Sequence, residues 1–553
     1  MSIYDGPAYR VLRSYLRDYS WPDELSIAVL SAKYGLIGGL AYIENYDHLM
    51  TKSRATELSL SINTTLADWS DTHSKVNFVL GKTYASALNK QLLAKHYTRR
   101  HRVVPGGIGE KLGSLHRLLR KTGKNKRTAP SLEHMQGRMM YVLPDWDDFI
   151  DPDYDYETDT FSAALRSERN ERHSVSLMRP HRICDGVLVS LAQNMGSKGL
   201  LRRVEAASVN SLAPKSIKRH FGMSVDQIAF GDCGAFSYVG EDEPTITVEQ
   251  AVAVYDLYGF DIGASVDHIP VKAIPTSDGI RTLSEYERRK RLKITRENAS
   301  QFIAEHKSRN ASFIPLGVIQ GLGPVSYANQ LGHYLEMGYD HIALGGLVPR
   351  TDNDIADIVR HIAKKRDELS SDPWIHLFGV FRPKLQSLFR ELRISSFDSA
   401  TYFRKAWLRS DQNYLGVDGQ WYAAVRLRPL YDPRNQILAR NSWRSLKAIS
   451  QLESAARDAL ASNKFSKASV KTTVDAIRQY DRALNPKMIV EEKLYEAYAR
   501  TLSSRIWTKC KCRACKKLGV HVVLFRGKNR NKSRGAHNTL MLYRIVRCKD
   551  LRP

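Results

Sequence analysis

Short apolar runs alternate with longer helix-compatible segments between His181 and Phe403, and this alternation constrains the fold more than any other feature. Apolar strands separated by helices are typical of a parallel sheet that is covered on both faces. Seven or eight such units over roughly 230 residues favour an α/β fold closed into a (β/α)8 (TIM) barrel. The seven strand-like runs are Ile183–Ala192, Gln227–Asp232, Asp261–Asp267, Phe313–Gly321, His341–Gly346, Ile375–Val380 and Ser395–Ala400.

Polar residues or a glycine pair stand at or near the ends of five of these runs. They are Asp232, Asp267, Gln320, Gly345–Gly346 and Asp398. A single Asp at such a position is commonly only the N-cap of the next helix. Five such strand ends together predict an active site, because barrel enzymes build it at the carboxyl ends of their strands.

Three cysteines crowd together near the end of the chain. Cys510, Cys512 and Cys515 fall within six residues, and His537 follows 22 residues after the last of them. Zinc prefers four tetrahedral ligands and accepts both thiolate sulfur and imidazole nitrogen. Three Cys and one His fill that shell, so we predict a structural zinc ion. Unliganded cysteines and a catalytic zinc are the two alternatives.

The formal net charge of +26 predicts a polyanionic partner, and nucleic acid is the first expectation. A generally basic chain without such a partner is the alternative. The candidate phosphate-binding side chains follow the cysteines and are Arg526, Lys528, Arg530, Lys532 and Arg534.

An acidic, aromatic run from Leu143 to Asp159 precedes the first strand-like run. Its density of aspartate and proline makes a regular helix or strand unexpected. Docking against a basic surface of the same chain is the simplest interpretation.

Composition divides the chain into four predicted segments. Residues 1–128 form a small α/β domain, with a strand-like run at Leu25–Ile37 and helical patterns at Thr56–Leu66 and Thr83–Lys95. The barrel spans 135–407, a basic helical insertion spans 408–507, and a zinc subdomain with the barrel end spans 508–553. The N-terminus has no apolar signal core and no run could span a bilayer, so we expect a cytoplasmic protein without a membrane segment.

The motifs of the barrel and the cysteine cluster, taken in order, resemble those of the tRNA-guanine transglycosylases. That family consists of zinc-containing barrels that exchange a guanine for a 7-deazaguanine base in a polynucleotide. The resemblance covers roughly residues 180–545. The similar stretches are Asp232–Phe236, Val266–Pro270, Ile319–Gly321, Gly345–Val348, His376–Pro383, Phe397-Asp398 with Arg404, and Cys510, Cys512 and Cys515 with His537-Asn538.

The resemblance implies a role for each matching residue. Asp398 is the nucleophile that attacks C1′ of the target nucleoside, and Asp232 is the general base for the incoming base. Arg404 holds a phosphate or orients Asp398. The base edge is bound by Asp267, Gln320, Gly345 and Gly346, and the four metal ligands hold zinc.

Departures from the family pattern carry further expectations. Val348-Pro349-Arg350 replaces a glutamate of bacterial members, which favours the neutral 7-cyano-7-deazaguanine as the incoming base. Ile269 replaces a cysteine beside Asp267. The 112 positions from Asp398 to Cys510 imply the helical insertion, and the short remainder after His537 predicts a short last barrel helix.

The N-terminal stretch Leu30–Met50 resembles the peroxide-stress (YaaA-type) domain. A tRNA-binding domain is not recognisable at the C-terminus. The architecture is therefore most similar to the DpdA-type branch of the family, which inserts 7-deazaguanines into DNA.

These features together predict a pentosyltransferase that exchanges guanine in DNA through a covalent Asp-deoxyribose intermediate. The target nucleotide must be flipped out or single-stranded. The alternatives are the same chemistry on tRNA, an inactive barrel kept for nucleic-acid binding, and an unrelated barrel hydrolase that uses an Asp pair. The presence of both Asp232 and Asp398 speaks against the inactive barrel. A partner ATPase of the same modification system is a further expectation from the resemblance.

Overall fold

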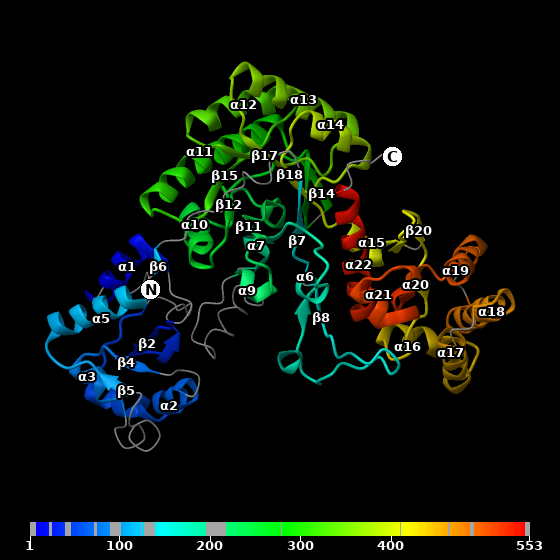
Figure 1. The fold of residues 1–553 in the computed structure, drawn as a ribbon, viewed down its shortest axis with the longest axis horizontal. Helices are drawn as coiled ribbons and strands as arrows, with labels where there is room; N and C mark the ends of the chain where they lie inside the picture. The colour runs from blue at the N-terminus through cyan, green and yellow to red at the C-terminus, as the bar shows by residue number, and fades with distance from the viewer. Residues whose placement is uncertain are drawn as a thin grey trace.

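The computed structural model describes residues 7–20, 25–38, 46–70, 75–88, 101–122, 124–125, 139–146, 148–194, 217–277, 279–409, 411–462, 465–486 and 491–547. The barrel occupies the centre and top of Figure 1. The N-terminal segment lies at the lower left, and the helical insertion and the cysteine-containing segment from residue 508 onward lie at the right.

Eight parallel strands close into a barrel, as the alternation predicted, in the order β10-β11-β12-β15-β16-β17-β18-β7. Seven of them fall within the seven predicted runs or within one residue of them. The bounds are β7 Met140–Pro144, β10 Gly186–Ser190, β11 Ile228–Asp232, β12 Ile262–Ala264, β15 Ile314–Ile319, β16 His341–Leu344, β17 Trp374–Leu377 and β18 Ser396–Asp398.

The eighth strand, β7, overlaps the start of the run from Leu143 that we expected to be irregular. Met140 to Leu143 are buried, and β7 pairs with β18 on one side and β10 on the other. The acidic residues of this run therefore begin at Asp145, directly after the strand ends at Pro144.

Two apolar layers hold the barrel together. Side chains such as Val142, Phe230, Leu316 and Ala343 form one buried cluster, and a second, larger cluster includes residues from the strands and the surrounding helices. Three of the helices begin with a capping box, whose Ser or Thr N-cap satisfies the free amides of the first turn. The helices are α10 Val248–Leu257, α11 Glu285–Ser308, α12 Pro324–Glu336, α13 Asp352–Glu368, α14 Gln386–Glu391 and α15 Thr401–Leu408.

The last helix, α22 (Lys528–Arg547), has 20 residues, so the prediction of a short final helix is wrong. The helix begins before His537 and carries that residue in its middle. It packs against α15, and a Cβ at Gly535 would come within 2.8 Å of the Phe403 ring. The close approach of the two helices explains why glycine stands there.

The segment 408–507 contains short strands before its helices. The strands are β19 Tyr414–Leu415, β20 Trp421–Tyr422 and β21 Val425–Arg426, and β21 pairs in parallel with β22 (Leu524–Phe525). The helices are α16 Pro433–Arg440, α17 Leu446–Ala461, α18 Lys467–Leu484, α19 Glu492–Ser504 and α20 Ile506–Lys509.

The N-terminal segment has two small apolar clusters of its own, one around Ile62 and one around Leu119. The run Leu25–Ile37 is a hairpin of β2 (Ala28–Ser31) and β3 (Gly35–Gly38) rather than a single strand, and α2 (Lys52–Ser70) contains the predicted helix at 56–66. The pattern from Thr83 to Lys95 forms only α3 (Lys82–Ala85) within the described residues, and its positions from 89 onward lie outside them. The remaining elements are α1 Pro7–Asp18, β1 Tyr19–Ser20, β4 Val76–Phe78, β5 His101–Val103, α5 Ile108–Thr122 and β6 Lys124–Asn125.

Candidate active site and metal centre

Asp398 is the last residue of β18 and is held through one of its two carboxylate oxygens. Its Oδ1 accepts a hydrogen bond from the backbone N–H of Gly379 at 2.7 Å and lies 3.2 Å from Nε2 of His376. The other ring nitrogen of His376, Nδ1, lies 2.6 Å from the hydroxyl of Ser396. Within the described part of the chain both hydrogen bonds to the Asp398 carboxylate use Oδ1, which leaves Oδ2 for chemistry.

Asp267 follows β12 and has both carboxylate oxygens engaged. Its Oδ1 accepts from the thiol of Cys233 at 2.9 Å, and its Oδ2 accepts from the amide of Gln320 at 2.6 Å. The hydroxyl of Tyr238 donates to the sulfur of Cys233 and to the carbonyl of Asp267. Burial raises the pKa of Asp267 above its usual range.

Asp232, at the end of β11, is a carboxylic acid with an unusual affinity for its proton. Burial, and then the negative charge of Asp267, raise its pKa to about 8; the charge of Asp398 acts in the same direction. At neutral pH this group therefore holds a proton that it can give to a nearby base.

Gly345 and Gly346 follow β16 and leave room for the side chain of Gln320. A Cβ at Gly346 would come within 2.6 Å of the Gln320 Oε1 atom, and the φ angle of +67° also favours glycine at this position. That Oε1 atom is buried and has no hydrogen-bond partner in the described residues. A bound molecule with an N–H group could satisfy it.

The structure thus brings Asp232, Asp267, Gln320, the glycine pair and Asp398 to the carboxyl ends of neighbouring strands. Arg404 lies on α15, the helix that follows Asp398, and its guanidinium carbon is 4.4 Å from the ring centroid of Trp146, which follows β7 and is 43% exposed. The sequence alone assigns no role to His376 or to the amide of Gly379, although both lie in the stretch His376–Pro383, which resembles a family motif.

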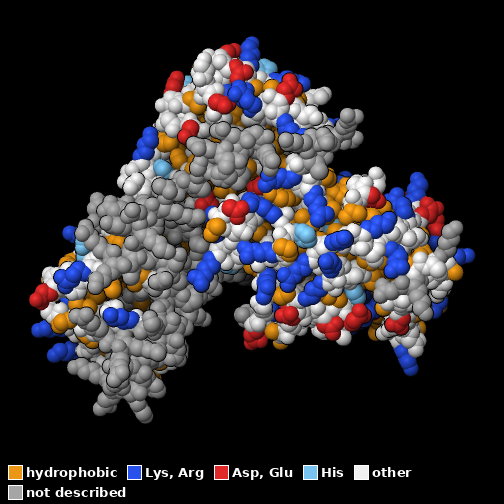
Figure 2. Space-filling model, in the orientation of Figure 1, with side chains coloured by type: hydrophobic (Ala, Val, Ile, Leu, Met, Phe, Trp, Pro, Cys, Tyr) orange, Lys and Arg blue, Asp and Glu red, His pale blue; other side chains and the backbone are white. Residues whose placement is uncertain are grey.

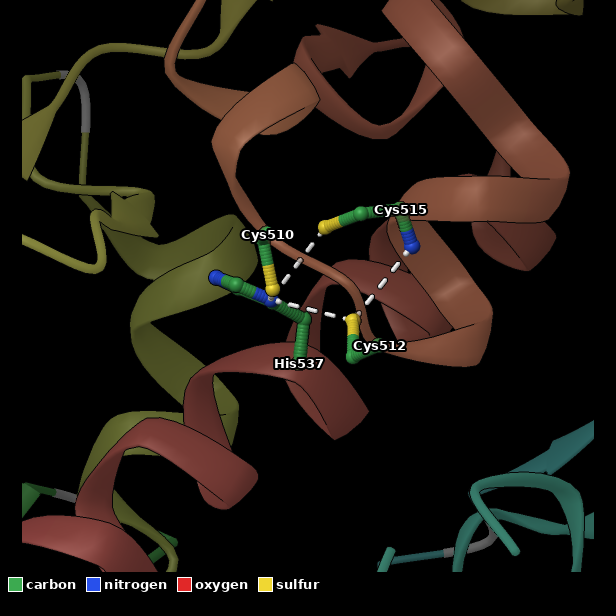
Figure 3. Close-up of side chains that lie close together, drawn as sticks. All are labelled: Cys510, Cys512, Cys515 and His537. Atoms are coloured by element: carbon green, nitrogen blue, oxygen red, sulfur yellow. Dashed lines mark hydrogen bonds between the residues drawn. The ribbon is translucent and has the colours of Figure 1, made fainter. Parts of the chain in front are cut away.

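The four predicted metal ligands come together in one buried cluster (Figure 3). Nδ1 of His537 lies 3.6, 3.4 and 3.3 Å from the sulfurs of Cys510, Cys512 and Cys515. Ligands at ordinary zinc distances around a tetrahedral centre would be separated by about 3.5 Å, so the donor set and its spacing suit such an ion.

The surroundings of His537 fix the ring in the orientation that a metal ligand needs. Its Nε2 lies 2.8 Å from the carbonyl of Leu415, which can only accept, so Nε2 carries the proton and Nδ1 is left for a metal. The ring stacks on Tyr414 with centroids 4.2 Å apart. Asn538 accepts from the Leu415 amide and donates to the Asn413 carbonyl, which ties α22 to the start of the insertion.

The arginines after the cysteines are structural, so the prediction that Arg526, Arg530 and Arg534 contact nucleic acid is wrong for these three side chains. Each is buried. Arg526 and Arg530 both bond the carboxylate of Asp159, whose side chain is 1% exposed. Arg534 donates to backbone carbonyls, including those of Val522 and Leu524. Lys528 is exposed, and Lys532 is half-buried with its ammonium group 3.1 Å from the carbonyl of Phe149.

The acidic run docks on this basic segment, as the simplest interpretation predicted. Besides Asp159, the carboxylate of Glu157 lies 2.9 Å from Nε2 of His521, and the carbonyl of Pro152 accepts from Lys517. Arg526 also pairs with Glu453 of α17 at 2.7 Å. The segment after the cysteines is therefore joined to both the acidic run and the helical insertion.

No family model matches the chain. The DNA-guanine transglycosylase of Salmonella montevideo is 32% identical over 409 residues, which are 73% of this chain and 96% of that protein. The chain belongs to the DNA-guanine transglycosylase family. The resemblance seen in the sequence is thus confirmed, and so is the enzyme class, because transglycosylases are glycosyltransferases.

Two archaeal relatives of the DNA-guanine transglycosylase family are more distant. The tRNA-guanine(15) transglycosylase of Methanococcus aeolicus (strain ATCC BAA-1280 / DSM 17508 / OCM 812 / Nankai-3) is 26% identical over 202 residues, 36% of this chain and 29% of that protein. That of Thermococcus onnurineus (strain NA1) is 27% identical over 294 residues, 51% of this chain and 46% of that protein. In the described residues, the helices are all too short or too polar to cross a membrane.

Proposed function

We propose that this protein exchanges guanine in DNA for 7-cyano-7-deazaguanine through a covalent intermediate on Asp398. The observation that carries the proposal is the pairing of two unlike carboxyl groups at one end of the barrel. Asp398 is fixed through Oδ1 with Oδ2 left for attack, and the pKa of Asp232 is raised to about 8. Two carboxyl groups in different environments are the arrangement that divides nucleophile from proton donor in glycosyl transfer.

The exchange proceeds in two halves. In the first, Oδ2 of Asp398 attacks C1′ of the deoxyribose, the bond from C1′ to N9 of guanine breaks, and Asp232 gives its proton to the leaving base. In the second, Asp232, now a carboxylate, takes the proton from the ring nitrogen of the incoming base. That nitrogen attacks C1′ and releases Asp398.

One pocket must bind guanine and its replacement in turn, so it reads the edge that they share. The unpartnered Oε1 of Gln320 accepts an N–H of the base, and Asp267 lies beside it. The network of Cys233 and Tyr238 holds Asp267 in place. Near the glycine pair, Val348 is exposed where bacterial members of the family carry a glutamate. A neutral side chain at this position suits a neutral 7-cyano group better than a charged amine.

The DNA-binding surface is better assigned to the cysteine-rich turn than to the segment after it. Lys509, Lys511, Arg513 and Lys516 are exposed there, and the sequence has no Asp or Glu between Glu496 and Asp550. Figure 2 shows Lys and Arg side chains gathered over the area of α6 (Ser174–Leu177), α21 (Arg513–Leu518) and α22. Such a concentration of positive charge supports backbone phosphate binding.

Zinc is the metal that the cluster of Cys510, Cys512, Cys515 and His537 fits best. Four protein ligands fill its tetrahedral shell, so the ion has a structural role. Bound by these residues, the ion would hold the basic turn against α22, which packs on the helix that follows Asp398.

Guanine exchange with radiolabelled guanine tests the proposal. The purified protein is incubated with labelled guanine and either duplex DNA or bulk tRNA, and label in the polynucleotide is counted. We expect incorporation into DNA, and its loss when unlabelled 7-cyano-7-deazaguanine is added in excess. Incorporation into tRNA alone would favour the second candidate, a tRNA-guanine transglycosylase, which the names of the two archaeal relatives suggest. A partner ATPase and a cytoplasmic location stay predictions.

A further inference from the structure

The corner between α16 and α17 carries large aromatic and apolar side chains that are exposed to solvent. Trp443 is 73% exposed, Ile437 is 59% exposed, and Leu446 is 51% exposed. On α16 the buried residues Asn435 and Ala439 face the protein, so Ile437 lies on the outer side of the helix. Large apolar groups that gather on one exposed surface commonly mark a binding site.

Arginines surround this apolar group. Arg434, Arg440 and Arg444 are all exposed, and the guanidinium carbon of Arg444 lies 4.3 Å from the ring centroid of Trp443. The sequence contains no Asp or Glu from position 433 to position 452. Asp432 accepts a hydrogen bond from the backbone N–H of Arg434 as the N-cap of α16. We call these six side chains (Arg434, Ile437, Arg440, Trp443, Arg444 and Leu446) the α16–α17 ridge.

The chemistry of the ridge fits nucleic acid better than a protein. An indole that is open to solvent offers a face on which a base can stack, and the arginines offer charge for the phosphates on either side. A surface that bound an apolar protein face would not need three exposed arginines, of which Arg434 alone has a carboxylate partner among the salt bridges of the described residues, Asp432 at 3.7 Å. Stacking requires a base that is not already stacked in a duplex, so the ridge suits single-stranded DNA.

The ridge is tied to the catalytic part of the protein. The hydroxyl of Ser442 donates to the carbonyl of Ala483 at the end of α18, which holds the α16–α17 corner on the helical insertion. Glu453 of α17 pairs with Arg526, and the chain from Arg526 leads directly into α22 beside α15. A strand held on the ridge is thereby held at a fixed place relative to Asp398.

We propose that the α16–α17 ridge binds a single-stranded segment of the DNA substrate, with one base stacked on Trp443 and phosphates on Arg440 and Arg444. The inference rests on the proposed function, because DNA whose target guanine has left the duplex has unpaired bases near it. The ridge then stabilises the opened substrate and takes no part in breaking the glycosidic bond.

Fluorescence anisotropy with a labelled single-stranded oligonucleotide and with the matching duplex tests the inference. We expect Trp443→Ala to weaken single-strand binding about ten-fold and Trp443→Phe, which keeps a ring, to weaken it less. The double variant Arg440→Glu with Arg444→Glu should also weaken the salt dependence of binding. The slope of log affinity against log salt concentration should fall by the amount expected for about two lost phosphate contacts. The matched controls are Tyr286→Ala, an exposed aromatic on α11, and Arg360→Glu, an exposed arginine on α13.

The same preparations are assayed for guanine exchange, so that the two hypotheses fail differently. One outcome is that wild-type protein exchanges guanine in DNA and Trp443→Ala binds single strands as tightly as Tyr286→Ala does. That outcome would overturn the proposed role of the ridge and leave the proposed function intact. Wild-type protein that exchanges no guanine in DNA would overturn the function. Weaker single-strand binding by Trp443→Ala, with the turnover rate at saturating DNA unchanged, supports the ridge.

Discussion

Replacing Asp159 by Asn should destabilise the fold, although Asp159 lies far from the candidate catalytic residues in the sequence. Its carboxylate is buried between the guanidinium groups of Arg526 and Arg530. Asn keeps the shape of the side chain, and it is among the residues that best tolerate the φ angle of +61° at this position. The substitution therefore removes a charge with little change in backbone strain.

The size of the expected loss in free energy of unfolding depends on which carboxylate partner each arginine keeps after the substitution. Arg526 keeps Glu453 at 2.7 Å, whereas Arg530 has no second carboxylate among the salt bridges of the described residues. One buried and uncompensated guanidinium costs about 3–5 kcal/mol. Replacing Arg530 by Met in the Asn variant removes that charge, so the double variant should recover much of the lost free energy of unfolding.

Urea unfolding followed by tryptophan fluorescence measures these differences. Asp153→Asn is the matched control, because Asp153 belongs to the same acidic run but its side chain is exposed. We expect the control to change the free energy of unfolding by less than about 0.5 kcal/mol. An Asp159→Asn variant as stable as the control, or a double variant less stable than Asp159→Asn alone, would refute the reasoning.

Three further predictions concern the metal, the acid and the nucleophile. Chelation of zinc, or Cys515→Ser, should lower the urea midpoint and the exchange activity together, with about one zinc released per chain; a chelated protein of unchanged stability would contradict a structural ion. The pKa of Asp232 is raised to about 8 in the folded state, so wild-type protein should lose stability relative to Asp232→Asn as the pH rises from about 4 to 8. A stability difference that stays constant over this range, measured by urea midpoints, would contradict the raised pKa. His376→Phe should lower the turnover rate at least about ten-fold at unchanged KM for the base, because Asp398 keeps the Gly379 amide at Oδ1 but loses the imidazole that lies beside the same oxygen. His376→Gln, which keeps an N–H donor, should retain more of the rate, and equal rates for both variants would count against a positioning role.

The barrel could be predicted from the sequence because its strands are buried on both faces and read as apolar runs between helices. The candidate carboxylates were found for the same reason, since each stands at or near the end of such a run. The candidate metal ligands were found because three of them lie within one turn of chain. The hairpin at Leu25–Ile37 read as one strand, because a tight turn at Gly35 interrupts an otherwise continuous apolar pattern.

The burial of the arginines could not be predicted, because their partners are distant in the chain. Asp159 lies 367 positions from Arg526, and a run of basic residues looks the same in sequence whether it faces solvent or an acidic segment. The role of His376 was hidden for a related reason. Its contact with Asp398 joins two neighbouring strands 22 positions apart, and only the register between β17 and β18 brings the side chains together.

The measurement that tests the account most directly is the capture of the covalent intermediate. Wild-type protein and Asp398→Asn are incubated with end-labelled DNA, denatured, separated on a gel, and digested for mass spectrometry. The account predicts a DNA adduct on the wild-type peptide at Asp398, which 7-cyano-7-deazaguanine discharges, and none with Asp398→Asn. An adduct that persists in Asp398→Asn, or one that maps to another carboxylate, would contradict Asp398 as the nucleophile.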